Sequence, residues 1–440
     1  MSSQELKLKP RDLYLNRLIS FRDTELIKVV TGIRRCGKSS LLKLMARHLR
    51  ETGIQDTQII EMNFESMSLS DMDNKQFYDY VMKRAVSNAK MYLFFDEVQR
   101  IEGWQKAVNS FRVDFSCDIY ITGSNAFLLS SELSTYLSGR YVEIRMLPLS
   151  FREFIDFHGY RLQKTLSPAG EPRNLIRSPS GEMFEPADLF KAYLKFGGMP
   201  SIADVGLQQE KAFAVLDGVY SAVVVRDILE RGRRKQQRLI TDPTLLRKLI
   251  MFLADNIGSN ISATSIGNTL ANEGLLNSGS RKSKPATKTI QAYIEALTEA
   301  YIFYEIKRFD IKGREFLRTL GKYYIVDIGL RNYLLGNRDA DSGHVLENIV
   351  YFELLRRGYD VAVGKIDNKE VDFIATKTDE KKYVQVTENM GSPETRRREL
   401  APLQAIRDNY EKTVLVLHDT LTPSVDGIKI TKILDFLLEE

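Results

Sequence analysis

The chain is poor in the residues that build metal cages and disulfide frameworks. Its 440 residues include only two cysteines and four histidines. The cysteines, Cys36 and Cys117, are too few for a set of disulfides or a tetrahedral zinc cage, and the histidines are too scattered for metal-ligand spacing. These absences exclude a disulfide-rich secreted fold and a histidine-based metal centre.

Long apolar runs are missing as well. No apolar stretch approaches the roughly 18 residues that a membrane-spanning helix needs. The first residues, Met-Ser-Ser-Gln-Glu-Leu-Lys, lack the apolar core of a signal peptide. Two isolated cysteines favour reduced thiols. The sequence therefore predicts a cytoplasmic protein that has no membrane partner.

Neither sign of charge dominates. The 63 basic and 58 acidic residues give a net charge of +5, which is too small to indicate nucleic-acid binding by itself. Basic residues do cluster at 226–238, 281–288 and 396–398, but such runs are usually solvated faces. The composition, 43% hydrophobic and 28% charged, is that of globular domains. The length allows about two to four of them.

What the sequence does contain is a phosphate-binding loop. Residues 32–39, Gly-Ile-Arg-Arg-Cys-Gly-Lys-Ser, fit the pattern G-x-x-x-x-G-K-[ST] between an apolar run at 26–30 and an amphipathic stretch at 40–49. A strand, a glycine loop and a helix together make an anion site, because backbone N–H groups point at the phosphates. We expect ATP to be bound by Gly32, Ile33, Arg34, Arg35, Cys36, Gly37, Lys38, Ser39 and Ser40.

Two carboxylates at the end of a later apolar run complete a hydrolytic site. Residues 91–97, Met-Tyr-Leu-Phe-Phe-Asp-Glu, resemble a Walker B strand that carries a catalytic glutamate. Asp96 would bind Mg²⁺ through its water shell, and Glu97 would polarise the water that attacks the γ-phosphate. Lys38 would contact the β- and γ-phosphates, and Ser39 would be a ligand of the Mg²⁺.

Two further residues are candidates for catalysis. Asn125 follows the apolar run 117–122 and is the preferred sensor of the γ-phosphate, with Ser124 next, although Gly-Ser-Asn also favours a simple turn. Arg140 precedes the apolar run 141–147, where AAA-type ATPases place an arginine finger that reaches a neighbouring subunit. An arginine there can equally well complement a helix dipole. A finger would require an oligomer.

Five apolar runs that alternate with helical segments predict an α/β, three-layer fold with a parallel sheet over residues 1–150. The spacing of about 60 residues between the two motifs fits the P-loop branch that has an additional strand. Residues 151–240 predict a helical lid and connector, in which the Pro-, Ser- and Gly-rich stretch 165–182 is expected to be an exposed loop.

Residues 241–338 predict a winged helix-turn-helix. Helical stretches at 245–256, 262–273 and 287–300 precede two strand-like runs at 301–306 and 322–326. The third helix would enter a major groove of DNA. Phosphate contacts are expected from Lys284, Lys288, Lys312 and Arg314, of which the last two would lie on the wing. The same fold also serves as a protein–protein module.

The last segment, 339–440, carries carboxylates on a helix and on the strands that follow it. Its layout resembles the PD-(D/E)XK nuclease fold, with Glu347 on the helix and Asp372 as the metal-binding aspartate. The expected Glu-x-Lys pair is replaced by Gln385 and Thr387, so the lysine is absent and a neutral amide replaces a charged ligand. Hydrolysis would be impaired.

The combination of motifs resembles one family from end to end. The marks are residues 31–39, Phe95-Asp-Glu97, Thr122-Gly-Ser124, Ser138-Gly-Arg140, Pro148-Leu-Ser-Phe151 and Glu370-Val-Asp-Phe373. They are similar to the prokaryotic AAA-type ATPases that join a winged helix and a degenerate PD-(D/E)XK domain to the ATPase. The resemblance implies ATP and Mg²⁺ as cofactors, a homo-oligomer with a hexamer as the expected form, and a role at DNA.

Three functions follow from these patterns. The leading one is an ATP-hydrolysing oligomeric motor or clamp that binds and remodels or translocates duplex or branched DNA. An alternative is an ATP-controlled switch in defence or regulation, in which the winged helix contacts a protein or an operator. Another is an ATP-dependent nuclease that requires Mg²⁺, against which the missing lysine argues.

Overall fold

The computed structural model describes residues 8–86, 88–126, 139–166, 170, 172–230, 242–272, 286–317, 321–336, 342–418 and 423–439. The chain divides into two compact units. One is Met1–Leu147 with Glu299–Tyr301, and the other is Pro148–Thr298 with Ile302–Glu440. Within the described residues, no helix is long and apolar enough to cross a membrane. The finer division into four domains stays a prediction.

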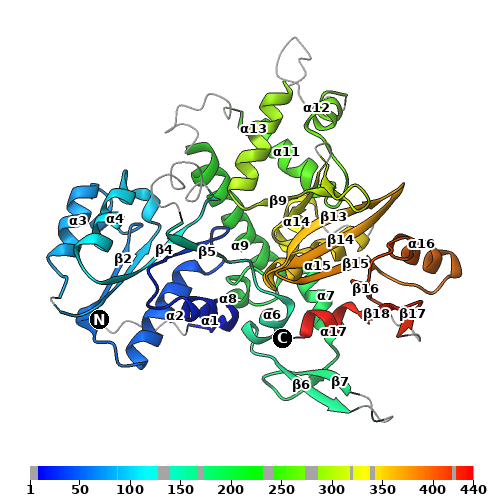
Figure 1. Cartoon of the computed structure of the whole chain (residues 1–440), viewed down its shortest axis with the longest axis horizontal. Coiled ribbons are helices and arrows are strands. Elements are labelled where there is room, and N and C mark those ends of the chain that lie inside the picture. The colour runs from blue at the N-terminus through cyan, green and yellow to red at the C-terminus, as the bar shows by residue number, and fades with distance from the viewer. Residues whose placement is uncertain are drawn as a thin grey trace. The chain divides into compact units, whose positions relative to one another are not determined.

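The first unit is built on a parallel sheet of five strands in the order β2-β3-β4-β1-β5 (Figure 1). In chain order its elements are α1 (Asp12–Ser20), β1 (Ile27–Thr31), α2 (Lys38–Glu51), β2 (Ile59–Asn63), α3 (Asn74–Met82), β3 (Met91–Asp96), α4 (Trp104–Asp114), β4 (Cys117–Gly123) and β5 (Tyr141–Arg145). All neighbouring strands run parallel. This confirms the predicted α/β fold and the additional strand, because β4 lies between the strands of the two motifs.

Helices cover both faces of this sheet. Alternate apolar residues of the strands, such as Ile119 and Ile121, pack with Phe77 of α3 and Phe111 of α4 in one core cluster. On the other face α2 contacts β3 and β4, and α1 contacts β5. Every residue of β3 is buried, which is why this strand is an unbroken apolar run and does not alternate. The three layers leave the carboxyl ends of the strands available for a ligand.

The second unit begins with helices and a small antiparallel sheet. Its elements are α6 (Phe151–Phe157), β6 (Arg161–Leu166), β7 (Pro172–Arg177), β8 (Met183–Phe184), α7 (Pro186–Phe196), α8 (Ile202–Val205), α9 (Gln209–Ser221) and a π-helical stretch, η5 (Ala222–Glu230). The expectation of an exposed loop over 165–182 is wrong. That stretch contains β7 and the last residues of β6, and the two strands pair antiparallel. Cross-strand pairs such as Leu162 with Ile176 set their register.

The next elements are the predicted three helices and strand pair. They are α11 (Pro243–Asp255), α12 (Ala263–Asn272), α13 (Thr287–Glu299), β9 (Phe303–Ile306) and β12 (Lys322–Ile325), and β9 pairs with β12 antiparallel. Asp242 caps α11 by accepting from Thr244 and Leu245. The name winged helix stays a prediction for this arrangement.

The wing itself differs from the expectation. Between β9 and β12 the chain forms β10 (Arg308–Asp310) and β11 (Glu315–Phe316), and β10 pairs with β13 in another sheet. Lys312 and Arg314 therefore lie on the β10–β11 turn and not on the tip of a wing. The Lys312 ammonium lies 2.6 Å from Asp367 Oδ1, and both side chains are exposed. The spacing of residues in the sequence could not predict that β10 pairs with β13, because this pairing joins residues far apart in the chain.

An eight-stranded sheet organises the rest, in the order β11-β10-β13-β14-β15-β16-β18-β17 (Figure 1). After α14 (Ile328–Leu335) come α15 (Ser342–Arg356), β13 (Asp360–Ile366), β14 (Lys369–Lys377), β15 (Glu380–Thr387), α16 (Pro393–Gln404), β16 (Glu411–Val416), β17 (Ser424–Val425), β18 (Ile428–Lys432) and α17 (Ile433–Leu438). The helix and strands that the sequence predicted here are present. The sheet crosses the predicted boundary at residue 338, because β10 and β11 precede it.

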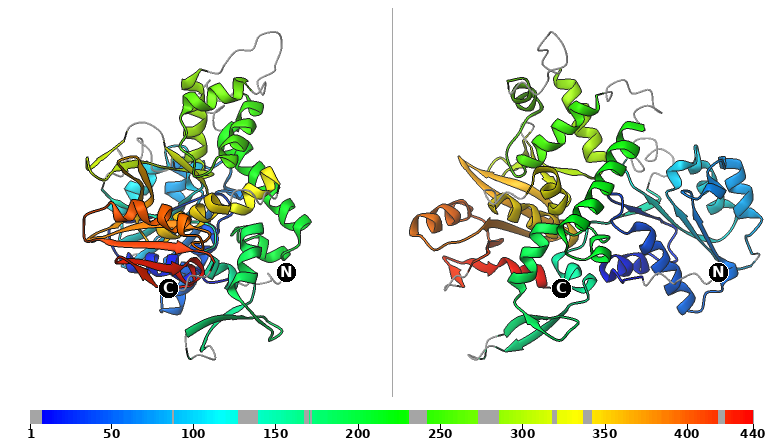
Figure 2. Two further views of the ribbon diagram at one scale, coloured as in Figure 1. Left: turned by 90° about the vertical axis from the view of Figure 1, so that its right-hand side faces the viewer. Right: turned by 180° about the vertical axis from the view of Figure 1, so that it is seen from behind.

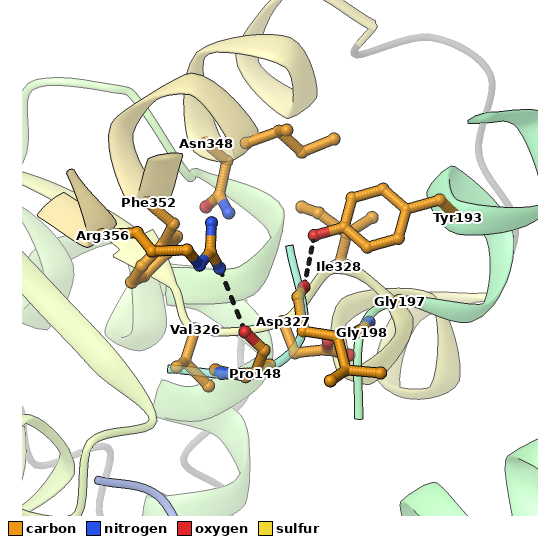
Figure 3. Close-up of a pocket in the computed structure, with 12 residues that line it drawn as sticks. Pro148, Tyr193, Gly197, Gly198, Val326, Asp327, Ile328, Asn348, Phe352 and Arg356 are labelled. Carbon is orange, nitrogen blue, oxygen red and sulfur yellow. Dashed lines mark hydrogen bonds between the residues drawn. The ribbon is translucent and has the colours of Figure 1, made fainter. Parts of the chain in front are cut away.

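A small pocket in the second unit is lined by residues that hydrogen-bond between distant segments of the chain (Figure 3). Arg356 donates to Pro148 O over 3.0 Å, and the Tyr193 hydroxyl donates to Leu149 O over 2.9 Å. Asp327 accepts from the backbone of Gly198 over 2.6 Å, and its complete burial raises its pKa to about 6. A cavity of about 20 Å³ has room for about one water molecule and is too small for a nucleotide.

Candidate nucleotide-hydrolysing site

The loop between β1 and α2 has the strained backbone of a phosphate cradle. Gly32 has φ +142°, and a Cβ there would lie 2.1 Å from Met146 O, so only glycine fits. Gly37 is the N-cap of α2 with φ 105°, and Arg35 is also left-handed, with φ 65°. Strain of this kind is retained where the surroundings impose it, and it commonly marks ligand-binding loops.

The nine residues predicted to bind ATP do lie together on this loop and the first turn of α2. Ile33, Cys36 and Lys38 are buried, Gly32 is too, and Arg35 and Ser40 are exposed. Burial raises the pKa of the Cys36 thiol, so this cysteine is a packing residue. Arg34 forms an ion pair of 3.0 Å with Glu65.

Lys38 is positioned by its own loop. Its ammonium donates to Gly32 O over 2.9 Å and to Ile33 O over 3.1 Å, and only 5% of the residue is exposed. These contacts curl the side chain over the loop, on the side to which α2 presents its N-terminus. The positive ammonium and the positive end of the helix dipole therefore both favour an anion at this loop.

A buried arginine that the sequence did not single out supports the loop. Arg11 donates through Nη1 to Cys36 O over 3.1 Å and to Leu147 O over 3.0 Å. It thereby ties the loop to the segment after β5. Arg11 is 3% exposed and precedes α1, and no sequence pattern links it to residues 25 and 136 positions away.

The two carboxylates lie where the sequence predicts, at the carboxyl end of β3. Asp96 accepts from Thr122 Oγ1 over 2.5 Å and from Asn63 Nδ2 over 3.0 Å. Burial raises its pKa, while hydrogen bonds from Thr122 and Ser39 act in the opposite direction. The Ser39–Asp96 contact brings together the two predicted Mg²⁺ ligands. Hydroxyl and carboxylate oxygens are the donors that Mg²⁺ prefers, so these residues fit the ion.

Glu97 is held in a left-handed backbone conformation, with φ 55°. Its N–H donates to Thr122 Oγ1 over 2.9 Å, and its Oε2 accepts from Ser124 Oγ over 3.2 Å. Gln99 also donates to Oε2. The carboxylate is 6% exposed and is aimed by two side-chain donors. No role was predicted for Thr122, Asn63 or Gln99. Thr122 was noted only as part of the family resemblance, and Asn63 and Gln99 carried no signal beyond their places at the end of β2 and in the turn after Glu97.

The remaining catalytic candidates are separated. Asn125 is buried two residues beyond β4, at the same edge of the sheet as Asp96, and it stays a predicted sensor. Arg140 is exposed and lies at the opposite edge, because its carbonyl accepts from the N–H of Ile27 at the start of β1. The structure therefore does not bring Arg140 to the site of its own chain.

The other predicted site residues lie in the second unit. Glu347 and Asp372 are buried on α15 and β14, and Lys322 of β12 lies 3.5 Å from Glu347 Oε2. Burial, followed by the charge of Glu347, raises the pKa of Asp372 well above its usual range. Lys288 is exposed on α13, and Lys284 lies outside the described residues. Their DNA contacts stay predictions, as do those of Lys312 and Arg314.

Comparisons with known proteins agree with the fold of the first unit. A family model described as an AAA domain matches residues 24–155, and a model described as a domain of unknown function matches residues 187–341. An uncharacterized protein of Haemophilus influenzae is 40% identical over 433 residues, covering 98% of each chain. An uncharacterized protein of Methanocaldococcus jannaschii is 30% identical over 394 residues, covering 87% of this chain and 79% of its own.

Among solved structures, the Walker-type ATPase of Pyrococcus abyssi is 16% identical to this chain, with a TM-score of 0.48. The similarity covers 74% of this chain and 95% of that one.

Proposed function

We propose that this chain, which belongs to the family of AAA-type P-loop ATPases, hydrolyses ATP as a homo-oligomer and uses the energy to remodel or translocate DNA. The observation that carries the ATPase proposal is the meeting of Lys38, Ser39, Asp96 and Glu97 at one edge of the parallel sheet. Phosphates on the loop would take Lys38 and the α2 N-terminus as their counter-charges. Mg²⁺ on Ser39 and Asp96 would neutralise charge that develops in the reaction.

Glu97 would polarise the attacking water. It is the carboxylate next to the Mg²⁺ ligand, and Ser124 and Gln99 hold its side chain in one orientation. A carboxylate held in this way can accept a proton from a water placed beside it. Positioning, together with charge stabilisation, is most of what phosphoryl transfer requires.

The position of Arg140 supports action between subunits. Arg140 precedes β5 at the amino edge of the sheet, and the loop that would bind phosphate follows β1 at the carboxyl edge. The strand between them spans about 13 Å. An exposed arginine on the far edge of the sheet is out of reach of its own nucleotide and is free to enter a neighbour's site. Head-to-tail contacts of this kind close into a ring when the rotation between subunits is a whole fraction of a turn.

Subunit mixing tests this arrangement. Arg140→Ala and Glu97→Gln are each expected to be nearly inactive, because every interface of either oligomer lacks one catalytic group. A mixture can pair an intact site of the Arg140→Ala chain with Arg140 of the Glu97→Gln chain. Equal mixing would complete about a quarter of the interfaces in a heterologous ring. Phosphate release should therefore reappear on mixing, and a mixture as inactive as its components would refute the finger in trans.

The β6–β7 arm supports the DNA part of the proposal. Figure 2 shows these strands extending away from α6 and α7. Arg161 lies directly opposite Arg177, and Thr165 opposite Arg173, so the three arginines share one face of the arm. Arg173 pairs with Glu185. Within the described residues, Arg161 and Arg177 are exposed and have no acidic partner.

Two like charges opposite each other cost stability in an antiparallel pair. Such a cost is compensated when an anion binds across both side chains. The phosphates of a DNA backbone are a regular row of such anions, and arginine binds phosphate in a bidentate manner. The arm therefore adds a contact surface to the predicted Lys288, Lys312 and Arg314.

Duplex and four-way DNA test the proposal. The double variant Arg161→Ser/Arg177→Ser is expected to bind both DNAs more weakly, with a salt slope reduced by about 2 because roughly 0.9 counterion is released per phosphate contact. The control Lys191→Ser/Lys211→Ser removes the same charge from exposed positions on α7 and α9. Fluorescence anisotropy at several salt concentrations measures both.

ATPase rates with and without DNA complete the test. We expect DNA to stimulate the wild type and to stimulate the arm variant less. Salt-insensitive binding without stimulation would contradict a DNA motor and favour an ATP-controlled switch. A change in the control variant equal to that in the arm variant would assign the effect to net charge and not to the arm.

A further inference from the structure

A buried cluster of charged and polar side chains lies in the second unit, where β12, α15, β14, β15 and α16 meet. Its members are Lys322, Glu347, Asp372, Gln385 and Glu399, and each is less than 10% exposed. We call these residues the ammonium cluster. It includes Glu347 and Asp372, the pair that the sequence predicted as ligands of a nuclease metal.

The lysine of the cluster is placed among the carboxylates. Lys322 Nζ lies 2.7 Å from Glu370 Oε1 and 3.5 Å from Glu347 Oε2. The Tyr324 hydroxyl donates to the same Glu347 oxygen over 2.8 Å. Both donors come from β12, which precedes the nuclease-like segment in the chain. Glu347 Oε2 is thus already shared by an ammonium and a hydroxyl.

The other predicted ligand, Asp372, also accepts a hydrogen bond from the chain. Asp372 Oδ2 accepts from the N–H of Val386 over 2.8 Å. The Gln385 amide, which stands where the nuclease pattern has a carboxylate, donates to Glu399 Oε2 over 3.3 Å. Glu399 Oε1 in turn accepts from Arg398 over 2.8 Å. Each carboxylate of the cluster has a donor from the chain itself.

These contacts decide whether a divalent ion fits. Mg²⁺ requires several oxygen ligands in a near-octahedral arrangement, which are usually carboxylates and waters. In the part of the chain that the structure describes, no group of three or more His, Cys, Asp or Glu residues is placed to bind a metal ion. The buried negative charges nevertheless need a counter-charge, because an unpaired carboxylate is costly to bury. Lys322 supplies it.

We propose that the Lys322 ammonium takes the place of the divalent cation in the nuclease-like fold, so that this module binds no metal and cuts no nucleic acid. The lysine that the sequence lacks at position 387 is therefore not the whole difference from an active site. In addition, Lys322 from β12, a strand outside the motif, neutralises the carboxylates. The same contact joins β12 to α15 and β14, and Asn260 adds a bond of 2.9 Å to Glu370.

Metal-dependent thermal stability of the full chain, without nucleotide, tests the proposal. Wild type is expected to gain no more from millimolar Mn²⁺ than Asp372→Asn does. Lys322→Ala is expected to melt at a lower temperature, and Mn²⁺ should recover part of the loss because removal of the ammonium opens the carboxylates. The double variant Lys322→Ala/Asp372→Asn should recover nothing. Lys312→Ala, which breaks an exposed pair with Asp367, is the matched control and should melt like wild type.

Two results would overturn the proposal. One is a Mn²⁺ stabilisation of wild type that Asp372→Asn removes, since it would reveal a native metal site. The other is a Lys322→Ala protein that melts lower and does not respond to Mn²⁺. If Lys322→Ala does not fold, nicking of supercoiled plasmid in Mn²⁺ by wild type and Asp372→Asn decides. Equal background nicking supports the proposal, and nicking that Asp372→Asn abolishes refutes it.

Discussion

Replacing Glu97 by glutamine is expected to lower kcat for ATP hydrolysis about 10²–10⁴-fold, the range for loss of a general base. The substitution changes no volume, and an amide can still accept a hydrogen bond from Ser124. It cannot accept a proton from water, so the loss falls on the chemical step and not on binding. Phosphate release at saturating ATP measures kcat, and titration with a fluorescent nucleotide measures affinity.

The matched control is Glu102→Gln, which makes the same change on an exposed glutamate shortly after Glu97 in the chain. It should leave both kcat and affinity unchanged. Lys38→Ala should instead weaken nucleotide affinity, because this ammonium would face the phosphates in the ground state as well as in the transition state. A Glu97→Gln protein that retains a tenth or more of wild-type activity would place the base elsewhere.

The sequence was sufficient to predict that Lys38, Asp96 and Glu97 lie together, because each of them ends a strand or follows one closely in the chain. A glycine loop after β1 and paired carboxylates after β3 are local patterns, and a parallel sheet brings strand ends to one edge. The residues that aim these groups were not predictable in this way. Thr122 touches Asp96 and Glu97 only because β4 lies between β1 and β3, and sheet order is not written in any local pattern.

The second unit was less predictable for the same reason. Helices α11, α12, α13 and α15 were predicted from their periodicity, and β9 and β12 from their apolar runs. The partner of β10 was not predicted, because its pairing with β13 spans about fifty residues. Lys322 likewise precedes the carboxylates that it neutralises, so a search for motifs after residue 339 could not include it. Long-range pairing decided both the fold and the chemistry here.

Long-range pairing also predicts a strongly destabilising single change in the core of the first unit. Lys28 on β1 and Asp118 on β4 form an ion pair whose two side chains are 0% exposed. Asp118 also accepts from Asp23 N over 2.8 Å and from the Tyr120 hydroxyl over 2.9 Å, and Lys28 donates to Thr24 O over 3.2 Å. The network occupies the amino edge of the sheet, opposite the nucleotide site.

Lys28→Met is expected to destabilise the unit by about 3–5 kcal/mol, because it leaves the carboxylate of Asp118 buried without its counter-charge. Lys28→Met/Asp118→Leu removes both charges and should recover much of this loss, although Asp23 N and Tyr120 OH then lack an acceptor. The exposed Lys106→Met is the control and should change stability by about 0.5 kcal/mol or less.

Hydrogen exchange of peptides from β1 and β4 is the suitable measurement, since a chain of two units has no single free energy of unfolding. A loss of about 4 kcal/mol lowers protection there roughly 10³-fold, and β14 and β15 of the other unit should keep theirs. If Lys28→Met and the double variant lose equal protection, the charge of Asp118 is not the cause. The stabilising role would then belong to other contacts of the lysine, such as that of its ammonium with the Tyr120 ring.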